Sequence, residues 1–473
     1  MTPSPGSPNV SPKSQAQNPK SVTSPLVPFA LGLAAVVVLL VVFRLPAFLG
    51  LTLATLVVGI VTPEVPFAEV PAEMAAAFGE VMTAVGIPIL MAALIGKSLM
   101  DSGAAERIVR AFLSKTGDER SEVALLGSSY VLSIPVFVDN VFYLLAPLGR
   151  SMYARTGTKY PLYVTVLSAG ALATHMLVPP TPGPLAMAET LDVDLGLAIL
   201  VGAAIALPMS AAAGLVYGHW LDRRLSIPLR EAMGSTASTL EEKAATSLDE
   251  LPGLGEALLP IVLPVVLIGA NTVSDALGVE GGGLAAATGF LGEPSVALTG
   301  AALVAMATYY RTSGLGPAAF RDALTEALKS GGNIIAITAA GGAFGALLRT
   351  AGVGEYIAGA LAEAGIPLLI TGWLIGGVIR IAQGSGTVAL LTGASMMAPL
   401  TGGLEVHPVY MMMAIGTGGL LFSWYNDSGF WIVNEVAGLT QGETLKTWSA
   451  ANTVMAFTGL GLVLLLATLL PLA

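Results

Sequence analysis

Long apolar runs alternate with short polar segments along almost the whole chain. Runs of membrane-spanning length lie at about 26–43, 46–62, 78–96, 161–178, 196–221, 257–277, 284–308, 330–348, 407–425 and 446–471. A helix of about 20 apolar residues crosses the hydrocarbon core of a bilayer, where every backbone polar group must be satisfied internally. The pattern therefore predicts an all-α polytopic membrane protein that lies in the lipid bilayer of the cell (inner) membrane.

Two further apolar stretches are interrupted at their centres by polar or helix-breaking residues. They are about 123–149, which contains SIPVFVDN, and about 366–400, which contains RIAQGSGT. Each is too interrupted for one regular span and too short for two. We expect both to be re-entrant hairpins, because irregular backbone at membrane depth is tolerated only where protein or a water-filled cavity covers it.

The chain divides at the charged, loop-like segment 222–256. On either side, we expect 26–221 and 257–473 to form two inverted repeats of about five transmembrane helices, the usual plan of a secondary transporter. Each repeat would contain one hairpin and one broken helix, the latter at about 161–190 and about 407–437.

Short sequence matches support the repeats. SGAAERI at 102–108 matches AGVGEYI at 351–357, with Gly103 aligned to Gly352. Farther along, three residues match at one constant offset: Gly183, Glu189 and Gly196 with Gly429, Glu435 and Gly442. The same order of features in both halves is stronger evidence than any single match.

The distribution of basic residues indicates that the repeats are inverted. The segment 101–160 holds Arg107, Arg110, Lys115, Arg120, Arg150, Arg155 and Lys159, whereas between 350 and 410 only Arg380 is basic. Basic residues are enriched in cytoplasmic loops. The first hairpin is therefore expected to enter from the cytoplasm and the second from outside, with 222–256 as a cytoplasmic linker.

The composition agrees with a membrane protein and excludes several other classes. Of the 473 residues, 54% are hydrophobic and 11% charged, and the mean hydropathy is +0.78. The chain lacks cysteine and has three scattered histidines, which argues against thiol and His-ligated metal sites. No basic stripe suggests nucleic acid, and no cofactor is expected. Residues 1–25, rich in Ser, Pro, Asn and Lys, are expected to be a disordered tail.

The broken helices carry ionisable residues at membrane depth. In LLFSWYNDSGFWIV (420–433), Asn426 and Asp427 interrupt an apolar run. We interpret this as a functional break that faces a ligand or ion; an ordinary turn near the interface is the alternative. In the first half, His175 precedes a proline-rich break. It is either a proton-handling group or a hydrogen-bonded core residue.

The hairpin centres supply the remaining candidates. Asp139 and Asn140 could cap a half-helix, bind a proton or cation, or contact the substrate. In the second hairpin, Arg380 carries a fork of donors suited to a carboxylate, although it could instead pair with an internal acid such as Asp139 or Asp427. Its polar neighbours are Gln383, Ser385 and Thr387, next to glycines and a helix N-terminus that suit an anion.

At these residues the chain resembles the gluconate permease family of proton symporters, within the ion transporter superfamily. The resemblance covers nearly everything after the tail. It is carried by IGKSLMDSGAAERI (95–108), SIPVFVDNVFYLLAPL (133–148), THMLVPPTPGPLAMAE (174–189), RIAQGSGTVALLT (380–392) and FSWYNDSGFWIVNEVAGLTQGETLKTW (422–448). It implies uptake of gluconate or related sugar acids, hydroxy acids or amino acids with protons. It also implies an elevator-like mobile domain and a homodimer.

The chain departs from the family pattern at five positions. Asp139 stands where a Glu is usual, and Asn140 replaces a small apolar residue. Thr181 and Trp424 each replace a histidine, and Asn434 replaces a lysine. These changes bear on the substrate and on the proton pathway.

The sequence thus predicts proton-coupled symport of a small sugar-acid or hydroxy-acid anion. Arg380, Gln383, Ser385, Thr387, Asn140 and Asn426 would bind substrate, and Asp139, His175 and Asp427 would couple protons. Sodium-coupled transport of a carboxylate or D-amino acid is the first alternative. An intramembrane hydrolase that uses Asp139 and Asp427 as paired acids is the second, and the absence of known protease spacing argues against it.

Overall fold

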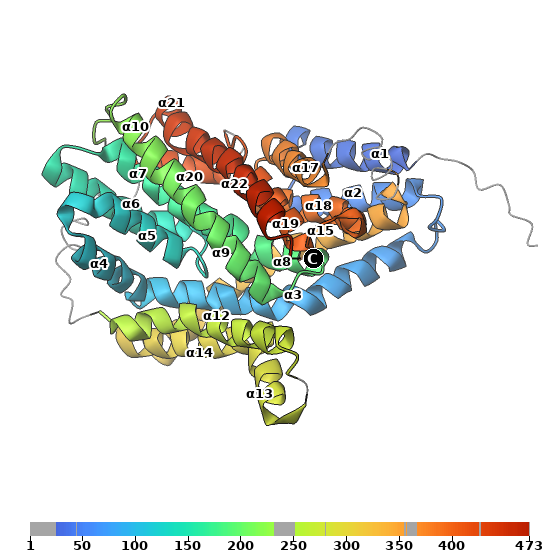
Figure 1. Cartoon of the computed structure of the whole chain (residues 1–473), viewed down its shortest axis with the longest axis horizontal. Coiled ribbons are helices and arrows are strands. Elements are labelled where there is room, and N and C mark those ends of the chain that lie inside the picture. Colours follow the sequence, from blue (N-terminus) through green and yellow to red (C-terminus); the bar gives the residue numbers. More distant parts are fainter. Residues whose placement is uncertain are drawn as a thin grey trace, which may run out of the picture.

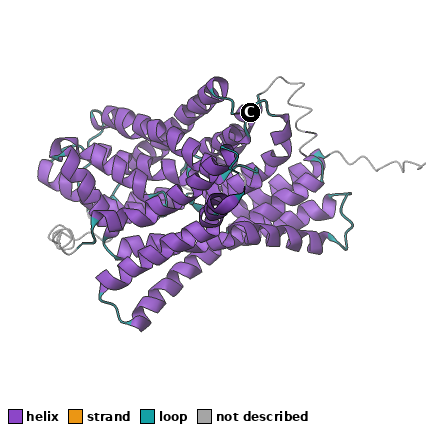
Figure 2. Cartoon of the chain, turned by 60° about the horizontal axis from the view of Figure 1, so that its bottom comes forward, coloured by secondary structure: helices purple, strands orange, loops and turns teal. Residues whose placement is uncertain are grey.

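The computed structural model describes residues 25–43, 45–230, 251–279, 281–353, 356, 367–424 and 427–472. Within these ranges the chain consists of helices joined by loops (Figure 2), which confirms the all-α prediction for this part of the protein. The predicted tail lies outside the described residues except for Pro25, and so does most of the predicted linker, residues 231–250.

The first half begins with α1 (Leu26–Val37), which continues as a π-helical turn to Val42, and α2 (Ala47–Val61). It continues with α3 (Val70–Asp101), α4 (Ala104–Thr116), α5 (Ser121–Leu132), α6 (Val138–Thr156), α7 (Tyr160–Leu177) and α8 (Pro182–Thr190). It ends with α9 (Leu195–Ala211), a π-helical turn (Ala212–Tyr217) and α10 (Gly218–Asp222).

The second half begins with α12 (Leu254–Ala276), α13 (Gly282–Gly292), α14 (Pro294–Ser313) and α15 (Pro317–Thr350). It continues with α17 (Leu368–Gln383), α18 (Gly386–Met397), α19 (Pro408–Gly418) and α20 (Ser428–Val436). It ends with α21 (Gln441–Thr444), a π-helical turn (Leu445–Ser449) and α22 (Ala450–Leu469).

Several of these helices are long and apolar enough to cross a membrane. In the described residues, length and composition identify six such spans, or seven if the bent pair α13–α14 counts as one. They are Val70–Asp101, Tyr160–Thr190, Leu195–Asp222, Leu254–Asp275, Pro317–Thr350 and Gln441–Leu469. The chain is therefore a multi-pass membrane protein. The apolar runs near its start form shorter helices, so the expected five spans in each half stay a prediction.

The apolar run 284–308, expected to be one span, is divided in the structure. α13 and α14 meet at Glu293 with a bend of 66°. The Glu293 carboxylate accepts the backbone N–H of Val296 at 3.0 Å and so begins a new helix, and Pro294 follows as its first residue. In Figure 1, α13 projects beyond α12 and α14 at the edge of the molecule.

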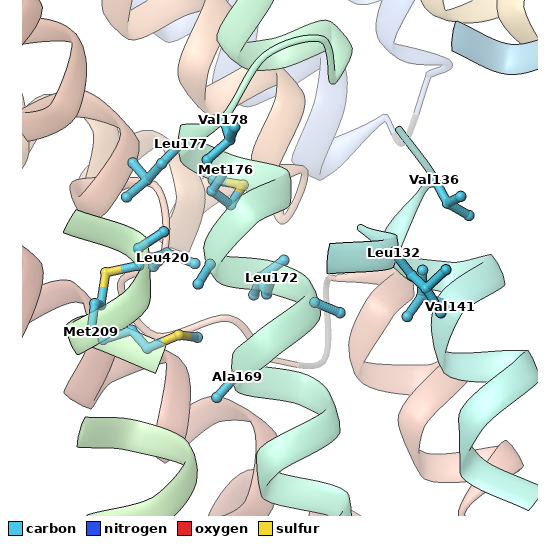
Figure 3. Packing of buried hydrophobic residues seen from close by; sticks show 14 of the residues in the cluster. Leu132, Val136, Val141, Ala169, Leu172, Met176, Leu177, Val178, Met209 and Leu420 are labelled. Carbon is cyan, nitrogen blue, oxygen red and sulfur yellow. The ribbon is translucent and has the colours of Figure 1, made fainter. Parts of the chain in front are cut away.

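α7 lies at the centre of the protein. Almost all of its residues are buried, and it packs against α5, α6, α9, α19 and α22. A helix that is apolar on every side is stable only where other elements surround it. Figure 3 shows buried side chains along α7, among them Leu172 and Met176, within the main hydrophobic core.

A second group of helices lies beside this centre. The two longest helices, α3 and α15, pack together along much of the molecule, with α14 against α3 and α2 against α15. α18 packs against α15 as well as against α17 and α8, and thereby joins this group to the centre.

The two halves share local geometry at matching positions. α8 and α20 each have nine residues, and their first residues are separated by the same offset as the matched pair Gly183 and Gly429. At that offset, Asp192 and Gly438 both adopt positive φ, and Asp194 and Thr440 both cap the next helix. The aligned Gly103 and Gly352 are also both left-handed, each just after a long helix. These matches support a structural repeat; its inverted orientation stays a prediction.

Candidate functional site

Four helix breaks surround the C-terminal end of α7. They separate α5 from α6, α7 from α8, α17 from α18, and α19 from α20. A Cβ placed on Gly386 would lie 2.8 Å from the Met176 sulfur, and one on Gly419 would lie 2.9 Å from its methyl group. The Phe137 ring meets the His175 ring edge-on, with 6.2 Å between centroids. Residues from all four breaks therefore meet next to Met176 and His175, and Figure 3 shows Met176, Val136 and Leu420 in this region.

The break between α5 and α6 falls where the sequence predicts an interruption. α5 ends at Leu132, and Pro135 cannot donate a backbone hydrogen bond. The Ser133 hydroxyl donates to the Val136 carbonyl at 3.2 Å, which satisfies part of the turn. α6 then starts at Val138, so that Asp139 lies in its first turn.

The break between α17 and α18 is short and made by two residues. Gly384 adopts a left-handed conformation with φ of 87°, and its N–H donates to the Arg380 carbonyl to close α17. The Ser385 hydroxyl accepts the Val388 N–H at 3.3 Å and caps α18. The N-terminus of α18, a partial positive charge, is thereby held beside Arg380.

Arg380 and Asp427 form a buried ion pair at the centre of the site. The Nη2 of Arg380 donates to Oδ2 of Asp427 at 2.6 Å, and only 3% and 6% of the two side chains are exposed. Nη1 of Arg380 donates to the Gly384 carbonyl at 2.5 Å, while Oδ1 of Asp427 accepts the Gly429 N–H at 3.0 Å and caps α20. The sequence predicted that Arg380 binds either a substrate carboxylate or an internal acid. In this conformation it pairs with an internal acid, Asp427.

Two residues that the sequence did not single out complete this pair. The Ser423 hydroxyl donates to Oδ2 of Asp427, and the Trp448 indole N–H donates to the Ser423 hydroxyl at 2.7 Å. Both side chains are fully buried. Trp448 is distant in sequence from Ser423, so only the fold reveals their hydrogen bond. The one signal in the sequence is that Ser423 and Trp448 both belong to the longest motif of the family resemblance.

Asp139 and Asn140 lie on the α6 side of the site. Asp139 is half-buried, and its carboxylate is close enough to Asp427 for the two charges to interact. The N-cap residue of α6 is Phe137, whose side chain makes no capping hydrogen bond, and Asp139 is the acidic residue of the first turn, so the capping role considered for Asp139 stays a prediction. The Asn140 side chain is exposed.

Two buried polar atoms in this region have no hydrogen-bond partner among the residues that the structure describes. They are Nε of Arg380 and Nδ1 of His175. Arg380 and His175 also lie within electrostatic range of each other. Because a buried polar group without a partner is costly, these atoms are candidates for contact with a polar ligand.

The other predicted residues are only partly described. Ser385 caps α18 as stated above, and Thr387 is half-buried in the first turn of that helix. Gln383 is the last residue of α17, but its side chain is outside the described part, as is all of Asn426. In the parts of the chain that are described, no cluster of His, Asp or Glu suits a metal ion.

Three of the five positions that depart from the family pattern make neutral hydrogen bonds to the backbone. The Thr181 hydroxyl donates to the carbonyls of His175 and Val178, at 3.0 and 2.8 Å. The Trp424 indole N–H donates to the Ile381 carbonyl at 3.0 Å, and the Asn434 amide donates to the Leu439 carbonyl at 2.8 Å. Each residue keeps a donor near a break without adding a charge.

Arg150, which was counted among the basic residues of 101–160, is buried in the structure. Its side chain is 3% exposed and donates to the Tyr160 hydroxyl and to the carbonyls of Ala437 and Arg230. Arg230 in turn forms a bidentate pair with Glu443, at 2.6 and 2.9 Å. Arg150 is thus a structural residue of the segment 101–160. Its donors satisfy the carbonyls of Ala437, at the end of α20, and of Arg230.

A known family and several known proteins match nearly the whole chain. The sequence profile of a family described as GntP family permease matches residues 24–470. The high-affinity gluconate transporter of Escherichia coli (strain K12) is 33% identical over 437 residues, which cover 92% of this chain and 98% of that protein. The inner membrane permease YgbN of the same strain is 34% identical over 439 residues, 91% of this chain and 96% of that protein.

A solved structure is similar in fold. It is that of MtrF from Neisseria gonorrhoeae, described as illuminating a class of antimetabolite efflux pumps. The TM-score is 0.61 at 15% sequence identity, and the match covers 84% of this chain and 83% of that chain.

Proposed function

Because the chain belongs to the GntP permease family, we propose that it is an inner-membrane transporter that takes up gluconate, or a related small sugar-acid or hydroxy-acid anion, together with protons. The gluconate transporter of Escherichia coli, matched over nearly its full length, supports this substrate class.

The observation that carries the proposal is the buried Arg380–Asp427 pair among the helix breaks. A carboxylate substrate needs a cation, and Arg380 supplies one that is permanent and has a fixed fork of donors. Asp427 already neutralises that cation. A second carboxylate binds there readily only when the first has lost its charge.

Proton coupling follows from this competition. When Asp427 takes up a proton, its hold on Arg380 weakens, and the substrate carboxylate replaces it on the guanidinium. Proton and anion then bind together, which is the differential affinity that symport requires. When the proton leaves, the Asp427 carboxylate reclaims Arg380 and the substrate departs.

The remaining predicted residues have supporting roles. Nε of Arg380 and Nδ1 of His175 are donor and acceptor positions for the substrate, and His175 also orients or shuttles the proton. Asp139 is a second proton-binding group, because its negative charge and that of Asp427 repel each other. The substrate hydroxyls are bound by five polar residues: Asn140, Gln383, Ser385, Thr387 and Asn426.

Alternating access is proposed to be elevator-like. The helix pairs α5–α6 and α17–α18 would be the two re-entrant hairpins of inverted repeats and would move with the broken helices α7–α8 and α19–α20. Their mutual packing next to Met176 supports one mobile unit. The long helices α3 and α15 would form part of the static scaffold, and a homodimer would anchor it.

The test is uptake of labelled gluconate by proteoliposomes that contain the full chain. We expect accumulation with an inward proton gradient and none after an ionophore collapses it, with or without Na⁺. Accumulation that requires Na⁺ at fixed pH would contradict proton coupling. No uptake of gluconate or of shorter hydroxy acids by folded protein would contradict the substrate class.

A further inference from the structure

The Asp427 carboxylate is held by a chain of hydrogen bonds that ends in an indole. Trp448 donates to Ser423, and Ser423 donates to Oδ2 of Asp427, the same oxygen that accepts from Arg380. A serine hydroxyl has one hydrogen to donate, and the Trp448 contact uses its lone pair, so the direction of the chain is fixed. Bonds in such a chain polarise one another, and donors to an ionised group form stronger bonds than neutral pairs do.

Local structure aims the indole at this point. Trp448 lies in the π-helical turn Leu445–Ser449, just before α22, and π-helical turns often lie at functional sites. Gly429, in the first turn of α20, makes room for the ring: a Cβ there would lie 2.8 Å from Cζ2 of Trp448. Trp448 is 1% exposed and Ser423 is wholly buried, so water does not compete for either group.

We propose that Ser423 and Trp448 are positioning residues that set the pH at which Asp427 takes up its proton. Their hydrogen bonds stabilise the ionised carboxylate, and they hold Oδ2 toward Arg380. We call the hydrogen-bonded chain of Trp448, Ser423 and Asp427 the relay. One consequence rests on the proposed function: the relay also sets the pH dependence of uptake.

Ionisable residues of several described helices lie around Asp427. α20 packs against α6, α21 and the π-helical turn, which carry as ionisable residues Asp139, Tyr143, Arg150, Tyr153, Arg155, Glu443 and Lys446. Of these, Asp139 interacts with Asp427 and favours its protonation, while Arg150 and Glu443 belong to the separate cluster with Arg230. From α17, Arg380 pairs with the Asp427 carboxylate, and the Arg380 charge also acts on His175 of α7. The relay adds a neutral, adjustable contribution to these fixed charges.

The test is an infrared pH titration of the full chain in lipid nanodiscs. The carboxylic-acid band of Asp427 is the band that disappears in Asp427→Asn. Replacing Ser423 with Ala removes a donor from the ionised form, so the proton binds at a higher pH. A hydrogen bond to a charged group corresponds to a shift of about one pH unit or more. We expect a smaller shift in the same direction for Trp448→Phe.

Two variants serve as controls. Ser423→Thr keeps the hydroxyl and should keep the midpoint. Ser449→Ala removes a buried hydroxyl from the same π-helical turn that has no partner among the described residues, and it should also keep the midpoint. An unchanged midpoint in both Ser423→Ala and Trp448→Phe would overturn the proposal, and so would a wild-type spectrum without an Asp427 band.

Gluconate uptake measured against pH gives the second readout. If Asp427 is the coupling group, the pH of half-maximal uptake should rise in Ser423→Ala by the same amount as the infrared midpoint. An infrared shift with an unchanged uptake profile would leave the relay standing and contradict the role of Asp427 in the proposed function.

Discussion

The helix break after α7 and the one after α19 occupy matching places in the two halves, but different chemistry satisfies them. In the first, the neutral Thr181 hydroxyl donates to two carbonyls left free at the end of α7. In the second, the Asp427 carboxylate caps α20 and reaches Arg380 and Ser423. The first break is closed by a group that does not titrate, and the second by one that does.

The proposed coupling would use the second break. A proton that binds at the second break changes the local charge and the pairing of Arg380, whereas no comparable event can occur at Thr181. The first half still contributes to the site, because His175 and Asp139 lie beside this pair. In the proposed mechanism the second half supplies the Arg380–Asp427 pair, and the first half supplies two further titratable groups, Asp139 and His175, beside it.

The largest effect is expected from Arg380→Gln. The variant removes the cation that pairs with Asp427 and should reduce gluconate uptake by about thirtyfold or more, since losing one partner of a buried charge pair costs about 2–5 kcal/mol. It also leaves Asp427 buried without its partner, which should lower the free energy of unfolding by about 3–5 kcal/mol. Uptake and thermal unfolding in detergent measure both quantities.

The double variant Arg380→Gln with Asp427→Asn separates the two effects. Without a charge at either position, stability should return toward the wild-type value while uptake stays lost. Recovery of uptake in the double variant would show that Arg380 serves only to neutralise Asp427.

A smaller effect is expected from Gly386→Ala. The added methyl group would lie 2.8 Å from the Met176 sulfur and 3.2 Å from Nη1 of Arg380, so the guanidinium must shift. Displacement of a substrate-binding group on this scale should slow uptake roughly tenfold or more. Gly332→Ala is the matched control, since a Cβ there meets no atom within 4 Å. Equal rates for the two variants would argue against close contact at the α18 N-terminus.

The smallest effect on transport is expected from Thr181→Val. The loss of the hydroxyl leaves two backbone carbonyls unpaired and should lower the free energy of unfolding by about 1–3 kcal/mol. The pH profile of uptake should not move, because nothing that titrates has changed. Thr181→Ser should restore the stability. A shifted pH profile in Thr181→Val would place the first break in the proton pathway as well.

From apolar runs and helix-breaking residues the sequence predicted an all-α membrane protein and the places of its helix breaks, although fewer spans are identified in the described residues than the ten predicted runs. Pro135 and Gly384 mark the predicted interruptions between α5 and α6 and between α17 and α18, because proline lacks a donor and glycine adopts positive φ. The sequence also predicted that Arg380 faces either a substrate or an internal acid. Local chemistry of this kind can be predicted without knowledge of distant contacts.

The tertiary partners could not be predicted in this way. The choice of Asp427 over Asp139 as the partner of Arg380 depends on how α17 and α20 pack, and the contact of Trp448 with Ser423 depends on a π-helical turn. The burial of Arg150 could not be predicted, because the positive-inside rule counts basic residues without regard to burial. The bend at Glu293 was missed because the segments on both sides are apolar, although Glu293-Pro294 is itself a helix-start signal.

The most direct test of the central claim compares two kinds of gluconate transport in Asp427→Asn proteoliposomes. Asparagine resembles the protonated acid, so Arg380 stays available to the substrate, but no proton can be released. The account predicts that gluconate exchange across the membrane persists and becomes independent of pH, while accumulation driven by a proton gradient is lost. Gradient-driven accumulation that survives in Asp427→Asn would contradict the claim that the Arg380–Asp427 pair couples the proton to the anion.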